Sequence, residues 1–118
     1  MPITRIDPNK RLSGAVVHGN TVYIAGQVAD KTKLDIKGQT QEILGKIDKL
    51  LTKAGTKKAN LLSAQIFITD MRNFAAMNEI WDKWVDPVNP PARATIQASL
   101  ATPEHLVEIM AIAAKDEK

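Results

Sequence analysis

The alternation of hydrophobic and polar positions changes its period several times along the chain. A helical period of about 3.6 residues is clearest at 39–54, where Ile43, Leu44, Ile47 and Leu51 fall on one stripe. Segments rich in β-branched and aromatic residues predict strands instead. These segments lie at 3–6, 15–18, 21–25, 61–69, 93–98 and 106–113.

Turn and cap residues separate the predicted elements. Gly19-Asn20 between two strand-like segments predicts a tight hairpin, and Gly55 stands where the first helix should end. Asp70 or Asn73 is the candidate cap of a second helix, and the proline-rich connector 85–91 cannot continue it. The second helix should face the core through Phe74, Met77, Trp81 and Trp84.

The predicted order of elements is β-β-β-α-β-α-β-β. Because the helices do not alternate strictly with the strands, this order predicts an α+β fold with a mixed sheet and both helices on one face. The last strand has apolar residues on both of its faces, with Glu108 as the one charged residue in 107–113. A lone domain would leave one face in water, so the sequence predicts an oligomer that covers it.

Length and composition narrow the range of functions. The chain has 118 residues, with 44% hydrophobic and 25% charged residues, which is typical of one globular domain. It has no cysteine, which excludes disulfides and thiol catalysis, and no apolar run of the ~20 residues that a membrane helix needs. We therefore expect a single domain over 1–118, located in the cytoplasm and without a membrane partner.

A net charge of +3 raises the question of nucleic-acid binding, but the pattern of residues argues against it. The lysines are scattered, acids lie among them, and no aromatic residues interleave with them to stack bases. His18 and His105 have no partner in a metal-binding motif, so we expect no metal site.

The main candidates for chemistry are Arg93, Glu108 and Gly26. Arg93 follows two prolines in the segment NPPARATIQ, and a guanidinium fixed at the start of a strand is suited to grip both oxygens of a carboxylate. Gly26 would let a ligand approach the backbone, and Glu108 offers a carboxylate that can hold a water molecule. On spacing alone, a rim arginine paired with an acid, a strand-end bulge at Gly26 and a solvated glutamate remain alternatives.

The spacing of these residues also predicts where a site would lie. If the last two strands form a simple hairpin, Glu108 lies near Gln97, and Arg93 is about 13 Å further along at ~3.3 Å per residue. The two side chains would then not reach one small ligand within one chain. Either one of them is outside the site, or the site lies between subunits, and the expected oligomer favours the second interpretation.

The chain resembles the reactive intermediate deaminase family, also called RidA or YjgF, over almost its whole length. The motifs that carry the resemblance are VYIAGQVA, KAGT, NLLSAQIFITDMRNFAAMNEIW, PPARATIQ and VEIMAIA. The resemblance implies a chorismate-mutase-like α+β fold, assembled as a homotrimeric barrel with clefts between subunits. It also implies hydrolysis of reactive 2-imino or enamine acids, which are small carboxylate substrates, to 2-keto acids and ammonia without a cofactor.

The same resemblance assigns roles to individual residues. It implies that Arg93 binds the substrate carboxylate and that Glu108 is associated with the attacking water. It also implies that Asn78 lies in the pocket and that the Gly26 backbone lines the cleft.

Other pocket positions depart from the best-known members. Leu12 stands about where a tyrosine is expected, Ala25 where serine is common, Thr95 in place of a cysteine, and Met110 at an often acidic position. These departures predict a divergent branch of the family. The alternatives are a non-catalytic trimer that binds a 2-keto acid as a sensor or interaction module, and a specialised deaminase or hydrolase of ring substrates. RNA cleavage, attributed to relatives, ranks last.

Overall fold

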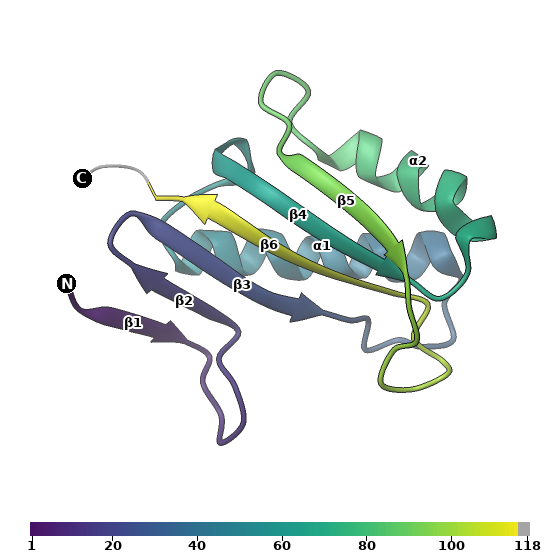
Figure 1. Cartoon of the computed structure of the whole chain (residues 1–118), viewed down its shortest axis with the longest axis horizontal. Helices are drawn as coiled ribbons and strands as arrows, with labels where there is room; N and C mark the ends of the chain where they lie inside the picture. Colours follow the sequence, from purple (N-terminus) through teal and green to yellow (C-terminus); the bar gives the residue numbers. More distant parts are fainter. Residues whose placement is uncertain (116–118) are drawn as a thin grey trace.

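The computed structural model describes residues 1–115, and its strands and α-helices follow the predicted order (Figure 1). The second helix and the last two strands begin or end within one or two residues of the prediction. The elements are β1 Ile3–Ile6, β2 Ala15–His18, β3 Thr21–Gln27, α1 Ile36–Lys53, β4 Leu61–Ile68, α2 Phe74–Trp84, β5 Ala92–Gln97 and β6 Val107–Ala114, with 3₁₀ turns at Lys58–Asn60 and Met71–Asn73.

The hairpin predicted at the start of the chain is confirmed. β2 and β3 pair antiparallel with His18 opposite Thr21, so Gly19 and Asn20 form the two-residue turn between them. Gly19 has a φ of 62°, in the left-handed region that favours glycine. This register turns Ile24 toward the core, where it is fully buried.

The last two strands do not form the hairpin assumed from the sequence. The sheet order is β1-β2-β3-β6-β4-β5, so β6 lies between β3 and β4, and β5 is an edge strand (Figure 1). β4 is parallel to β5 and antiparallel to β6. The assumption was wrong because β4, α2 and β5 form a strand–helix–strand unit, which places β5 beside β4 in parallel.

Both ends of α1 are fixed by local hydrogen bonds. The helix begins earlier than its apolar period predicted, because the side chain of Asp35 caps it by accepting a hydrogen bond from the Gly38 N–H at 2.9 Å. The predicted end at Gly55 is confirmed by its φ of 81°. The N–H groups of Gly55 and Thr56 donate to carbonyls in the last turn of α1.

The two helices cover one face of the sheet, and the core lies between them and the strands (Figure 1). The predicted apolar stripe of α1, including Ile43 and Ile47, is buried against sheet residues such as Ile66 and Ile109. Each side chain of this size contributes about 1.5–3 kcal/mol when it is fully buried. No helix among residues 1–115 is both long and apolar enough to cross a membrane.

The opposite face of the sheet, which we call the open face, carries no helix within residues 1–115 (Figure 1). Its central positions are largely apolar, and Tyr23 and Ile96 are 47% and 44% exposed. The two-faced pattern predicted for the last strand is confirmed, because Ile109 is buried on the helix side while Met110 is exposed on the open face. The sheet therefore presents an apolar surface that residues 1–115 do not cover.

Replacing Asp35 by Ala should lower the free energy of unfolding by about 1 kcal/mol, because the Gly38 N–H then loses its acceptor. Asp35→Ser supplies another short capping oxygen and should retain most of the stability. Urea denaturation at one fixed protein concentration measures both effects. Equal losses in the two variants would contradict the capping role.

Candidate functional site

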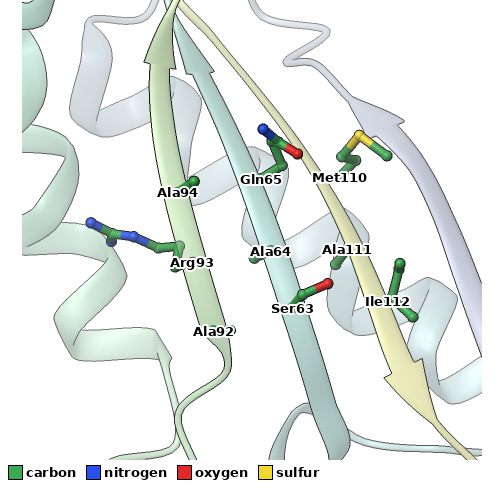
Figure 2. A pocket seen from close by; sticks show the side chains of 9 residues that line it. All are labelled: Ser63, Ala64, Gln65, Ala92, Arg93, Ala94, Met110, Ala111 and Ile112. Carbon is green, nitrogen blue, oxygen red and sulfur yellow. The ribbon is translucent and has the colours of Figure 1, made fainter.

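The structure places Arg93 in the edge strand β5, directly after the proline segment. It lies opposite Ala64, a buried residue of β4, so its side chain leaves the sheet on the helix-covered face. The Arg93 Cζ atom is 5.2 Å from the centroid of the Trp81 ring and 5.9 Å from that of Phe74. Arg93 is among the residues that line the groove over β5, β4 and β6, and Figure 2 shows its guanidinium pointing toward α2 rather than toward Gln65 and Met110.

Two aromatic rings, rather than an acid, hold this guanidinium. Within residues 1–115, Arg93 makes no hydrogen bond or ion pair, and each ring contact contributes about 0.5–2 kcal/mol. Partial burial lowers the pKa of Arg93 from its ordinary value, and the nearby charge of Asp82 opposes this effect. An arginine nevertheless stays protonated at neutral pH, so all of its N–H donors are available to an anion.

Phe74 departs from the core-facing stripe predicted for α2. Met77 and Trp81 are buried as predicted, and Trp84 packs against the core, but Phe74 is 39% exposed. Its ring supports Arg93 instead of filling the core. The sequence reasoning missed this role of Phe74 and Trp81, although their spacing of two helical turns was a visible signal.

Two buried oxygen atoms on the elements that position Arg93 have no hydrogen-bond partner among residues 1–115. Thr95 shares its face of β5, and the Oγ1 atom of Thr95 is buried and unpaired. Asn78 lies one turn after Phe74 on α2, and its Oδ1 atom is also buried and unpaired. Such atoms are rare in folded proteins, so these two are candidate contacts for a polar ligand. Arg93, Thr95, Phe74 and Met71 line a cavity of about 460 Å³.

Gly26 and Glu108, two other predicted site residues, meet where β3 ends. The β3–β6 pairing shifts register between Ile24 and Gln27, and Gly26 lies within this irregularity. A Cβ atom at Gly26 would overlap the carboxyl group of Glu108, so the missing side chain makes room for that group. The Glu108 side chain makes no hydrogen bond or ion pair with any other of the described residues.

Leu12 and Ala25 lie near Gly26, in a cavity whose lining residues do not include Glu108. Together with Gly26 they line a cavity of about 600 Å³ that extends to α1 at Lys46 and Lys49. Leu12 is exposed in the loop between β1 and β2. The predicted residues thus form two groups. We call Arg93, Thr95 and Asn78 with the rings of Phe74 and Trp81 the arginine half, and Glu108, Gly26, Ala25 and Leu12 the glutamate half.

The two halves are separate within one chain. The side chain of Arg93 projects from the helix-covered face, whereas that of Glu108 lies on the open face with Met110. The pairings through β4 place Arg93 level with Ala111, and Glu108 level with Ile96. Arg93 and Glu108 are therefore about 10 Å apart along the strands and about 10 Å apart across two strand spacings. The separation predicted from the sequence holds, although the hairpin used to derive it was wrong.

Each half has a distinct chemical capacity. The arginine half offers a rigid cation with free donors for a carboxylate, and the glutamate half offers a proton acceptor beside exposed backbone. Among residues 1–115, no three His, Asp or Glu side chains are placed to share a metal ion. The arrangement is suited to binding an anion and moving a proton, provided that the two halves are brought together.

Comparisons with known proteins agree on one family. Residues 2–115 match the model of the endoribonuclease L-PSP family. A RutC family protein of Haemophilus influenzae is 52% identical over 114 residues, which cover 96% of this chain and 98% of that protein. The crystal structure of a YjgF family member from Neisseria meningitidis has a TM-score of 0.97 at 36% identity and covers 100% of this chain and 98% of that one. A Rid family protein of unknown function from Yersinia pestis has a TM-score of 0.84 at 32% identity, covering 91% and 90% of the two chains.

Replacing Gly26 by Ala should displace the Glu108 carboxyl group while leaving the free energy of unfolding within about 1 kcal/mol of the wild-type value. The new methyl group meets the far end of a flexible side chain, which can rotate away at little cost. A crystal structure of the variant and urea denaturation test the two parts. An unmoved Glu108 side chain in the variant would contradict the close contact.

Proposed function

The chain belongs to the endoribonuclease L-PSP family, also named the YjgF, Rid or RutC family, and from this membership we propose that it hydrolyses reactive 2-imino or enamine acids. The products are 2-keto acids and ammonia. Rid family members are often enamine or imine deaminases, and the chain has the chorismate-mutase-like fold of this family.

The observation that carries the proposal is that the Arg93 guanidinium is held in place while its hydrogen-bond donors have no partner among residues 1–115. Two rings orient it, and no acid among the described residues occupies its donors. A planar guanidinium in this state binds both oxygens of a carboxylate and fixes the direction in which the rest of the substrate extends. A 2-imino acid bound in this way has its reactive C2 atom directly next to the anchored carboxylate.

Hydrolysis then requires a positioned water molecule and a group that transfers protons. The water oxygen bonds to C2 while Glu108 takes one proton and passes it to the nitrogen, which gives a carbinolamine. The carbinolamine loses its hydroxyl proton to the nitrogen by the same route, the C2–N bond breaks, and ammonia leaves a 2-keto acid. An enamine acid enters this sequence as its imine tautomer, in which C3 has gained a proton from solvent and the nitrogen has lost one to solvent. Orientation and proton transfer together supply several kcal/mol of the acceleration.

We place the reaction in clefts between the subunits of a homotrimer. Arg93 and Glu108 lie on different faces of one sheet, so a shared substrate requires the arginine half of one subunit and the glutamate half of its neighbour. The apolar open face supports assembly, because residues such as Tyr23 and Ile96 are exposed in the single chain. Rid family proteins are typically homotrimers.

A non-catalytic trimer that binds 2-keto acids is the second candidate. It is favoured by the apolar side chains of Leu12 and Ala25 near Gly26 and of Met110 beside Glu108 on the open face. They reduce the hydrogen-bonding capacity of this half, while the arginine half keeps its anchor. Such a protein would bind 2-keto acids through Arg93 without accelerating the decay of imines. The variants below separate the two candidate functions when the binding of a 2-keto acid and the rate of imine hydrolysis are measured on the same samples.

The name of the family model refers to RNA cleavage, which we do not propose here. Several lysines of α1 are paired with acids, so they do not form a continuous cationic surface for a phosphate backbone. These pairs are Lys37 with Glu79, Lys46 with Asp30, and Lys53 with Asp7.

Arg93→Ala should lower kcat/KM for a 2-imino acid by about 100-fold or more, because two charge-assisted hydrogen bonds to the carboxylate are lost. Arg93→Lys keeps the charge without the planar fork and should be intermediate. Arg72→Ala is the matched control, since Arg72 is exposed and pairs with Asp70, and it should match the wild type. Imines generated by an amino-acid oxidase provide the assay. Activity of folded Arg93→Ala within about twofold of the wild type would refute the mechanism.

The intersubunit cleft predicts complementation between two inactive variants. When Arg93→Ala and Glu108→Gln chains are refolded together in equal amounts, about a quarter of the clefts in randomly mixed trimers combine an intact Arg93 with an intact Glu108. Activity should therefore return to about a quarter of the wild-type value. The matched control mixes Arg93→Ala with the double variant, in which no cleft is intact. No recovery in verified mixed trimers would contradict a cleft that combines Arg93 of one subunit with Glu108 of its neighbour.

A further inference from the structure

Gln39 is a fully buried polar residue in α1, with 0% of its surface exposed. The Nε2 group of Gln39 lies 3.2 Å from the carbonyl oxygen of Thr32, 3.1 Å from that of Leu34 and 3.0 Å from that of Glu104. Its Oε1 atom accepts a hydrogen bond from the Leu106 N–H at 2.9 Å. Both ends of the amide are therefore satisfied by backbone groups outside α1.

These backbone groups belong to two loops that are distant in sequence. The loop 28–35 joins β3 to α1, and the loop 98–106 joins β5 to β6. Figure 1 shows both loops at the end of the sheet where β3 stops and β6 starts. Gly26 lies just before the first loop, and Glu108 lies just after the second. One side chain thus ties together the segment that follows Gly26 and the segment that precedes Glu108.

The position of Glu108 depends on this backbone tie. Its side chain has no hydrogen bond of its own among residues 1–115, so the backbone at the start of β6 sets the point from which its carboxyl group reaches Gly26. Leu106 is held from both sides there, because its N–H donates to Gln39 and its carbonyl accepts from the Thr69 N–H at 3.1 Å. Loss of the Gln39 amide would leave the Leu106 N–H unpaired and free one side of this anchor.

We propose that Gln39 is a positioning residue that sets the Glu108 carboxyl group against Gly26 by holding the two loops together. This inference rests on the proposed hydrolysis and extends it to a residue that touches no substrate. Because Arg93 belongs to the other half of the cleft, loss of Gln39 should impair the proton-transfer step and spare carboxylate binding. In kinetic terms kcat falls while KM is maintained.

The neighbouring residue Thr40 provides a matched control. It is also 0% exposed, and its Oγ1 atom donates to the Ile36 carbonyl at 2.7 Å within α1. Thr40→Val removes a buried hydrogen bond from the same helix without releasing either loop. Gln39→Met removes the amide while keeping a side chain of similar length. A purely structural role for Gln39 would make the two variants alike in kinetics.

The test compares kcat, KM and the free energy of unfolding for these variants. Both should lose stability, but only Gln39→Met should lower kcat, by about tenfold or more, with KM within about twofold of the wild type. If Gln39→Met does not fold, Gln39→Glu serves in its place, because it keeps the acceptor for the Leu106 N–H and loses the donors to the carbonyls of Thr32, Leu34 and Glu104. Its kcat should fall below that of Thr40→Val.

The outcomes separate this inference from the proposed function. An unchanged kcat in the folded Gln39 variant, or an equal fall in kcat for Thr40→Val, overturns the positioning role and leaves the hydrolysis intact. A wild-type protein that does not accelerate imine decay overturns the hydrolysis and this inference with it. Retained binding of a 2-keto acid by Gln39→Met, with reduced kcat, supports both.

Discussion

The placement of β6 between β3 and β4 is the constraint on which the candidate site depends. It brings Glu108 beside Gly26 at the end of β3, and it leaves β5 at the edge, where Arg93 reaches the rings of α2. These pairings are made by backbone hydrogen bonds, so the separation between the two halves does not depend on the side chains within either half. The pocket can change its chemistry while the framework that positions it stays the same.

The two faces of the sheet meet different physical demands. The helix-covered face buries a continuous core and supports Arg93 through Trp81, which is itself part of that core. The open face presents apolar residues that a single chain leaves in water. Assembly through this face would remove these apolar side chains from water. It would also complete a cleft that neither half forms alone. Stability of the assembly and function would then depend on the same surface.

Local patterns were sufficient to predict the elements but not their neighbours. Gly19 and Gly55 marked a turn and a helix end because positive φ angles leave a strong sequence signal. The pairing of β5 with β4 left no such signal in the sequence, because contacts between distant segments determine which strands are neighbours. Arg93 and Glu108 were identified by residue type and motif. Gln39 was missed because glutamine usually lies at the surface, although it occupies the same helical stripe as Ile43 and Ile47.

The physical separation of the arginine half from the glutamate half bears on how such proteins diversify. In the proposed trimer, a substitution at Leu12 or Ala25 reshapes the wall contributed by one subunit, and the stacked guanidinium contributed by its neighbour is undisturbed. In that assembly, recognition of the acid group and treatment of the rest of the substrate would be adjusted independently. An evolving protein of this kind would gain activity on a new substrate through substitutions in the glutamate half, while the arginine half stays unchanged.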